Sequence, residues 1–159
     1  MNIYRISALL ICLFSTATNA SSESEYINFF GKYQALGNSF DVAVSELYSD
    51  QATIIAVRKM PDGIEQTMKI RGKKWKQMIA YSMDLGKQRG DISEFSNIKV
   101  SIDKNRAKVT ANRYSTIKCF NDSGYYMIIE KGDNNKLQIV EEFIESPLQS
   151  SCTNTPKSD

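Results

Sequence analysis

Hydrophobic residues recur at helical spacing in three early parts of the chain. The pattern predicts helices over residues 26–36, over residues 40–47, and from Gly72 to about residue 89. Glycines follow the first and third helices, at Gly37 and Gly90, where a residue without a side chain commonly ends a helix. Three helices are therefore expected, with the second short and close behind the first.

Asn38 or Ser39 can cap the second helix, and the polar run at 48–50 can close it. The third helix carries Lys87 and Arg89 in its last turn, where cations suit the helix dipole. The inner face of the first helix comprises Tyr26, Phe29, Phe30, Tyr33 and Leu36. That of the third comprises Trp75, Met78, Ile79, Ser82 and Met83.

The remaining segments alternate in polarity or are rich in β-branched residues, as strands are. Met60-Pro61-Asp62-Gly63 is a turn signal, so the segments on either side of it should form a hairpin. Further turn signals separate the later segments into a meander. The expected strands are 52–57, 65–70, 98–102, 107–120, 125–130 and 137–144.

This order of elements predicts an α+β domain in which the helices lie on one face of a curved antiparallel sheet. A sheet that bends around helices forms a cone with a pocket between the two layers. The sequence therefore predicts a site inside the cone as well as an outer sheet face.

The N-terminal segment, residues 1–20, has the pattern of a cleavable secretory signal peptide. Arg5 precedes an apolar run over residues 6–14, which is too short to span a bilayer as a permanent helix. Small residues follow up to Ala20, so the expected new N-terminus is Ser21. The alternatives are a buried core helix or a retained anchor.

Cleavage would leave one domain over residues 21–146 and a polar C-terminal tail over 147–159. Such a protein would be periplasmic in a bacterium, or secreted. Removal of Arg5 lowers the formal net charge from +2 to +1, and this near neutrality gives no indication of a nucleic-acid partner.

Two cysteines follow the signal segment, Cys119 and Cys152. In an oxidising compartment we expect them to form one disulfide that ties the tail to a strand. The alternatives are two free thiols or a bond to another chain.

Three stretches resemble the nuclear transport factor 2-like superfamily, also called the cystatin-like α+β cone. Residues 41–54 resemble the second helix of that family running into its first strand, residues 72–79 the opening of its third helix, and residues 136–143 its last strand. The resemblance extends over residues 26–145 and implies the cone-shaped fold. The superfamily contains enzymes, transport adaptors and secretion-system subunits, so the fold constrains function poorly.

Ketosteroid isomerase-like members of that superfamily use a carboxylate base on the first strand, with a tyrosine and a protonated acid as hydrogen-bond donors. By position, the resemblance assigns the donor role to Tyr33. It places the base near Ala56 and the acidic donor near Met127, neither of which can transfer a proton. Tyr33 alone is more often a core residue than a catalyst.

The sequence contains no histidine, which excludes a His–Asp pair and any Ser–His or Cys–His nucleophile. No cofactor or metal site is expected. Among the acids of the last strand, alternation places Glu142 on the opposite face from Glu141 and Glu145. If it points inward, Glu142 is a candidate pocket acid with a raised pKa; the alternative is a solvated sheet face.

A basic cluster surrounds the start of the third helix: Lys69, Arg71, Lys73, Lys74 and Lys76. It could dock an anionic partner such as phospholipid headgroups, a glycan or an acidic protein. The favoured alternative is a solvated turn around Trp75, with lysine stems covering apolar surface. Contact with a membrane surface is therefore not the preferred interpretation.

Arg113, Tyr114, Tyr125 and Tyr126 lie on two strands that should pair. They could form a protein interface, including that of a homodimer, or ordinary sheet packing. The leading hypothesis is an exported, non-catalytic binding or assembly module whose partner is an apolar small molecule or a protein. The alternative is a small isomerase or lyase, similar to ketosteroid isomerase, with an incomplete site.

Overall fold

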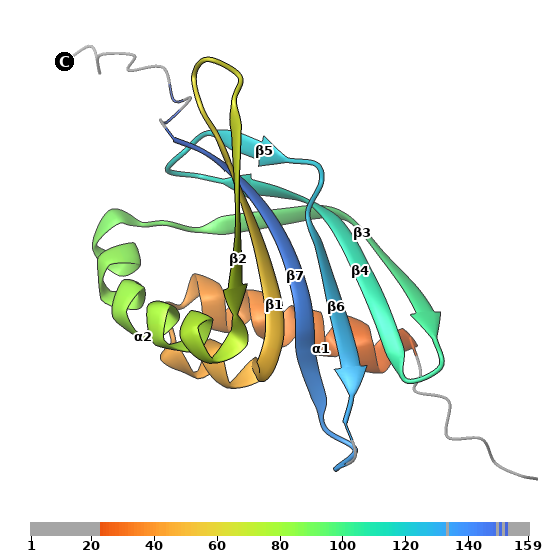
Figure 1. The fold of residues 1–159 in the computed structure, drawn as a ribbon. Helices are drawn as coiled ribbons and strands as arrows, with labels where there is room; N and C mark the ends of the chain where they lie inside the picture. The colour runs from red at the N-terminus through yellow and green to blue at the C-terminus, as the bar shows by residue number, and fades with distance from the viewer. Residues whose placement is uncertain (1–22, 133, 149, 151, 153–159) are drawn as a thin grey trace, which may run out of the picture.

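The computed structural model describes residues 23–132, 134–148, 150 and 152 (Figure 1). The predicted signal peptide, residues 1–20, lies outside the described residues, and so does most of the predicted tail.

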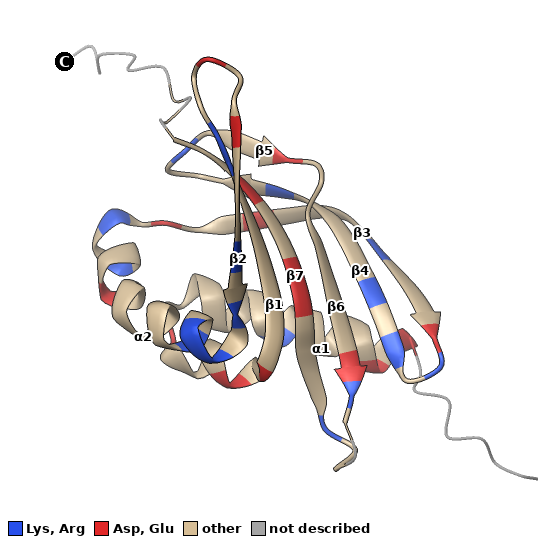
Figure 2. Cartoon of the chain, viewed as in Figure 1, with Lys and Arg blue, Asp and Glu red and all other residues tan. Residues whose placement is uncertain are grey.

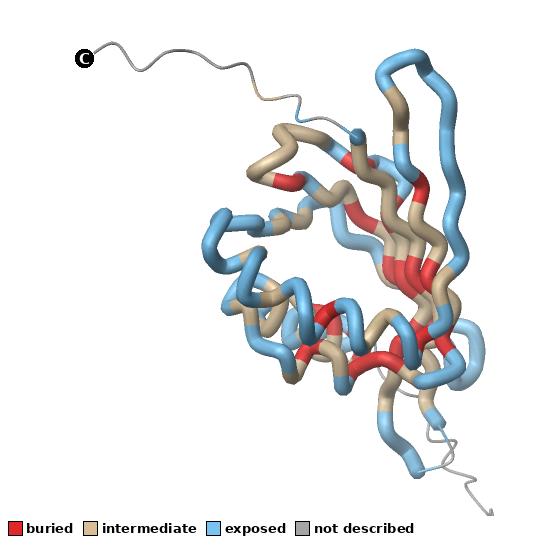
Figure 3. Tube along the Cα trace, turned by 60° about the vertical axis from the view of Figure 1, so that its left-hand side comes forward, coloured by how far each residue is buried: buried red, intermediate tan, exposed pale blue. Residues whose placement is uncertain are grey.

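A curved sheet forms one layer of the domain (Figures 1 and 3). The strands are β1 (Tyr48–Lys59), β2 (Glu65–Arg71), β3 (Ser93–Asp103), β4 (Arg106–Ser115), β5 (Phe120–Asp122), β6 (Tyr126–Lys131) and β7 (Leu137–Pro147). Among the described residues these seven strands have the order β2-β1-β7-β6-β4-β3, with β5 paired to β4. The predicted α+β class with a curved sheet is confirmed.

One pairing departs from the expected antiparallel sheet. β1 and β7 run parallel, with Ile54 beside Glu142 and Ile55 beside Phe143, whereas the other pairs are antiparallel. A parallel pair needs a long crossover, and here α2 and the intervening strands connect β1 to β7. The sheet is therefore mixed.

The helices lie on one side of the sheet, which curves around them (Figure 3). They are α1 (Glu23–Asn38), η1 (Val42–Leu47) and α2 (Gly72–Arg89). The predicted second α-helix is wrong, because η1 is a 3₁₀ helix of 6 residues. Since α1 continues to Asn38 and β1 already begins at Tyr48, little chain is left for α-helical turns. The cap is Asp41, whose Oδ1 accepts the Ala43 N–H at 2.8 Å.

The single long strand predicted over 107–120 is also wrong. β4 ends at Ser115, and the chain turns before β5 pairs back onto β4. Cys119 lies in this turn with φ of 47°, a left-handed conformation that reverses the chain. Other strands are longer than expected, and β7 continues to Pro147.

The main core fills the space between α1 and the concave face of the sheet. Tyr26 and Phe30 of α1 are buried against residues of the central strands, including Val109, Met127 and Ile139. α2 begins at Gly72, where a Cβ would lie 2.0 Å from the Ser49 backbone oxygen. Glycine at this position thus permits α2 to approach β1 closely.

The predicted bridge between Cys119 and Cys152 is confirmed. It joins the turn between β4 and β5 to the chain beyond β7, across a sequence separation of 33 residues. Within the described part of the chain, no helix is long and apolar enough to cross a membrane.

Candidate functional site

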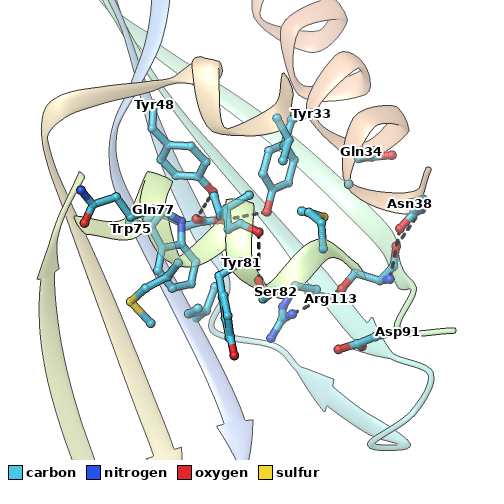
Figure 4. Close-up of a pocket in the computed structure, with 18 of the residues that line it drawn as sticks. Tyr33, Gln34, Asn38, Tyr48, Trp75, Gln77, Tyr81, Ser82, Asp91 and Arg113 are labelled. Atoms are coloured by element: carbon cyan, nitrogen blue, oxygen red, sulfur yellow. Dashed lines mark hydrogen bonds between the residues drawn. The ribbon is translucent and has the colours of Figure 1, made fainter. Parts of the chain in front are cut away.

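A pocket of about 640 Å³ lies where α1, α2 and the concave face of the sheet meet (Figure 4). Its volume falls in the range typical of small-molecule sites. Polar lining residues include Tyr33, Tyr48, Arg113 and Glu142. The apolar wall includes Trp75, Met78, Ile79, Met83, Phe95 and Ile144.

Glu142 is the centre of a buried polar cluster. Glu142 is only 1% exposed. Its Oε1 accepts hydrogen bonds from the hydroxyls of Tyr33 at 2.8 Å and Tyr125 at 2.9 Å. Its Oε2 accepts one from the Tyr48 hydroxyl at 2.5 Å. Three tyrosines from separate segments therefore converge on one carboxyl group, and we call these tyrosines and Glu142 the tyrosine–glutamate cluster.

A register shift in β7 brings Glu142 to the concave face. Ile139 and Glu142 are both buried, although residues three apart in a regular strand point to opposite faces. The pairing of β6 with β7 is irregular between these two residues, since Ile128 pairs with Glu141 while Ile129 pairs with Ile139. The extra residue of this bulge turns Glu142 inward.

Burial dominates the electrostatics of the cluster. It raises the pKa of Glu142, and the hydrogen bonds from the three tyrosines and the charge of Arg113 oppose this rise. Burial, followed by the nearby charge of Glu142, also raises the pKa values of Tyr33, Tyr48 and Tyr125. The three phenols therefore remain protonated donors across physiological pH.

The hydrogen bonds restrict the chemistry of Glu142. A carboxylate offers about four acceptor positions, and the tyrosines fill three of them. A general base needs a free lone pair that faces its substrate. The geometry therefore suits a fixed polar floor better than a proton-abstracting group.

Two buried N–H donors of the pocket lining have no hydrogen-bond partner among the described residues: Trp75 Nε1 and Arg113 Nε. The indole N–H faces the Tyr48 hydroxyl closely enough to oppose the rise in the Tyr48 pKa, but the contact falls short of full hydrogen-bond geometry. Arg113 Nε lies 3.7 Å from Asp122 Oδ2, an ion-pair distance. Buried donors usually have acceptors, so the Trp75 N–H calls for an explanation, whereas Arg113 Nε already faces a carboxylate.

The positions to which the isomerase resemblance assigns catalytic roles do not lie together in one site. Ala56 lines a different cavity, of about 300 Å³, beside the C-terminal half of β1. Met127 is fully buried and pairs with Glu142 across β6 and β7. The strand beside Met127 thus supplies a carboxyl group, and Tyr33 contacts it.

The four residues predicted as an interface do not share a face. Arg113 lines the pocket and Tyr125 is buried in the cluster. Tyr114 follows Arg113 on β4 and points to the opposite, convex face, where it is 37% exposed. Tyr126 donates to Glu141 at 2.8 Å and stacks on Phe143. A protein interface on the convex face of the sheet stays a prediction.

The basic cluster is also divided. Lys76 Nζ pairs with Asp50 Oδ1 at 2.7 Å. Lys73 and Lys74 are exposed, and Lys74 lines the pocket mouth. Within the described residues, no group of three or more His, Cys, Asp or Glu could hold a metal ion.

No protein-family model matches the sequence, and no curated protein matches it. Solved structures match its fold. An NTF2-like protein of unknown function from Pseudomonas putida is 11% identical, with a TM-score of 0.58 over 81% of this chain and 89% of that chain. An NTF2-like protein with a cystatin-like fold from Novosphingobium aromaticivorans is 15% identical, with a TM-score of 0.52 over 82% and 83%.

A candidate ketosteroid isomerase from Parabacteroides distasonis is 14% identical, with a TM-score of 0.50 over 82% of this chain and 91% of that chain. Identities this low establish the fold alone. The chain has the NTF2-like, or cystatin-like, fold, as the sequence resemblance predicted.

Sequence reasoning missed two members of the cluster. The sequence pattern predicts Tyr48 at the end of a helix and Tyr125 at a candidate interface. Each of these tyrosines lies at the boundary of an element. Tyr48 is 94 residues from Glu142 in the sequence and Tyr125 is 17 residues from it. The available signal was the number of tyrosines in the chain, 8 in total.

Proposed function

We propose that this protein is an exported NTF2-like module that binds an apolar small molecule carrying an acceptor oxygen, such as a carbonyl or a carboxylate. The observation that carries this proposal is the buried indole N–H of Trp75, which lines the pocket and has no acceptor among the described residues. A ligand oxygen beside it would satisfy a donor that is otherwise costly to bury.

The rest of the pocket supports the same ligand chemistry. The hydroxyl protons of Tyr33 and Tyr48 are committed to Glu142, and the guanidinium of Arg113 contacts Ser93, Glu145 and Asp122. The buried donor of the lining that is left for a ligand is therefore the Trp75 N–H. Apolar side chains of α2, β3 and β7 line the wall and would cover a hydrophobic body. Orientation would come from the polar floor, and binding energy mostly from the wall.

Export is part of the proposal and rests on two observations. Residues 1–20 have a signal-peptide pattern, and Cys119 and Cys152 form a disulfide, which suits an oxidising compartment. The test is the intact mass of the protein expressed from the full sequence and recovered after export. A chain that begins at Ser21 is expected, and a chain that retains Met1 would contradict export by cleavage.

Trp75 is the single tryptophan of the sequence, so its indole N–H gives one signal in a ¹H–¹⁵N spectrum. Three probes with decyl chains are titrated: 2-decanone, decanoate and decylammonium. We expect 2-decanone and decanoate to shift the indole proton downfield and to saturate, because their oxygens accept its hydrogen bond. Decylammonium has no acceptor and should leave the signal unchanged.

Trp75→Phe keeps an aromatic ring and removes the indole N–H donor, whereas Tyr126→Phe removes a hydroxyl on the opposite face of the sheet. Binding to both variants is measured by calorimetry, because the first variant lacks the indole signal. The first variant should bind 2-decanone more weakly, and the second should bind it like the unmodified protein. Saturable binding of decylammonium alone, or of no probe, would contradict the proposal.

A second candidate is an isomerase or lyase, which the contact between Tyr33 and the buried Glu142 favours. Such an enzyme would move protons next to a carbonyl group. The test is deuterium exchange into 2-decanone in D₂O. Exchange that requires Glu142, and is lost in Glu142→Gln, would establish catalysis. The binding function predicts no exchange above the rate without protein.

A further inference from the structure

Three apolar side chains stand exposed on successive turns of α2. Tyr81 is 88% exposed, Met78 is 40% and Leu85 is 43%. Helical geometry places them within about 60° of one another around the axis, in a single stripe. A surface helix normally turns such residues toward the core, so an apolar stripe facing outward indicates a partner.

This stripe forms part of the pocket mouth. Met78 and Tyr81 line the pocket, and Lys74 lies one turn before Met78 on the same wall. Figure 4 shows Tyr81 with its hydroxyl directed away from Tyr33 and Tyr48. A partner on the stripe would therefore meet the opening through which a ligand enters.

The charge around the stripe is strongly positive. α2 carries five Lys or Arg residues and one Asp. Figure 2 shows the basic residues at both ends of the helix. Lys76 pairs with Asp50, but Lys73 and Lys74 form no ion pair with any described residue. Lysines that flank exposed apolar side chains are typical of helices that lie in the surface of anionic membranes.

We propose that the α2 rim, defined as Lys73, Lys74, Met78, Tyr81 and Leu85, docks the mouth of the pocket onto an anionic lipid bilayer. This rests on the proposed function, because it names the bilayer as the source of the apolar ligand. The apolar residues enter the headgroup region while the lysines contact lipid phosphates. A purely acidic protein would pair with the lysines but would leave the apolar stripe exposed.

The test uses protein expressed from the full sequence and purified in its processed form, with the N-terminus checked by mass. Co-sedimentation is measured with vesicles of phosphatidylcholine alone and of phosphatidylcholine with phosphatidylglycerol. We expect binding to the anionic vesicles only, with a steep decrease as salt is raised. Absence of binding to anionic vesicles at low salt would overturn the proposal.

Two double variants separate charge from apolar contact. Each lysine near a bilayer contributes about 5-fold in partitioning, so Lys73→Gln with Lys74→Gln should weaken binding about 25-fold. Tyr81→Ser with Leu85→Ser leaves the charge unchanged and should also weaken binding by several-fold. If this second variant binds like the unmodified protein, the partner is an acidic surface without apolar contact and the bilayer proposal is wrong.

The matched control is Lys99→Gln with Lys104→Gln, which removes two exposed lysines from the hairpin of β3 and β4. It should bind vesicles like the unmodified protein. An equal loss in the control would mean that net charge, not the α2 rim, drives binding. Failure of this proposal is distinguishable from failure of the pocket proposal through Lys73→Gln with Leu85→Ser, which changes only rim residues outside the pocket lining. This variant should bind anionic vesicles more weakly and should bind 2-decanone, in a titration without vesicles, like the unmodified protein.

Discussion

Replacing Tyr125 with phenylalanine tests the buried cluster with the smallest change. The variant removes one hydroxyl from a residue that is 1% exposed and leaves the ring in place. That hydroxyl donates to Glu142 Oε1 at 2.9 Å, and Oε1 keeps its bond from Tyr33. Tyr125 is not among the pocket-lining residues, so the effect should fall on stability.

The expected cost follows from the charge of the acceptor. A hydrogen bond to a charged group contributes about 1.5–3 kcal/mol, and one between neutral groups about 1 kcal/mol. We expect Tyr125→Phe to lower the free energy of unfolding by about 2 kcal/mol when Glu142 is ionised and by about 1 kcal/mol when it is protonated. The larger loss corresponds to a decrease of several degrees in Tm.

The pH dependence of this loss has a defined sign. The hydroxyl of Tyr125 lowers the pKa of Glu142, so its removal raises that pKa further above the ordinary value. The bond to the ionised form is present above the folded pKa of Glu142 and is lost as the pH falls through it. The destabilisation by Tyr125→Phe should therefore be greater at pH 8 than at pH 4.

Urea unfolding at several pH values measures this loss. Tyr126→Phe is the matched control, because the neighbouring hydroxyl bonds Glu141 on the convex face. The control should cost less than about 1 kcal/mol, because this part-buried contact lies at the sheet surface, where water can replace the lost hydroxyl. Equal losses for the two variants, or a loss for Tyr125→Phe that does not change with pH, would refute the assignment of Glu142 as a buried, titrating centre.

Three further predictions test the fold and the site. Gly72→Ala should lower the free energy of unfolding by about 3 kcal/mol, because its Cβ would lie 2.0 Å from a backbone oxygen. Gly31→Ala, in open space on α1, should instead raise the free energy of unfolding by about 0.5–1 kcal/mol. Equal effects of the two variants in chemical denaturation would contradict this packing. Cys152→Ser should cost about 3 kcal/mol, and the unmodified processed protein should show no reactive thiol in denaturant without reductant. The Tm of Glu142→Gln minus that of the unmodified protein should increase as the pH rises above 4.5, because the raised pKa of Glu142 makes its ionisation destabilising. A Tm difference that does not change with pH would contradict the raised pKa.

Elements with strong local signals could be predicted from the sequence. The hairpin turn at 60–63, the stop of α2 at Gly90 and the order of helices and strands follow from glycine, proline and hydrophobic spacing. Local signals could not reveal the turn at Cys119, because residues 116–119 contain no glycine, proline, asparagine or aspartate and the left-handed residue is a cysteine. They also could not reveal the parallel pairing of β1 with β7, which depends on distant segments.

The site was predictable only in part. Strand alternation placed Glu142 apart from its acidic neighbours, and the family resemblance singled out Tyr33. That these two meet depends on the curvature of the sheet and on the bulge in β7, which the sequence does not mark. Trp75 was expected on an inner helix face, but whether its N–H has a partner depends on the three-dimensional packing.

The central claim is that the pocket holds an apolar ligand whose oxygen accepts the buried N–H of Trp75. Native mass spectrometry of the processed protein, purified without detergent from the cells that produce it, tests this claim most directly. The account predicts a bound small molecule that contains oxygen and is released on unfolding. A ligand-free protein, or a bound species without an acceptor oxygen, would contradict it.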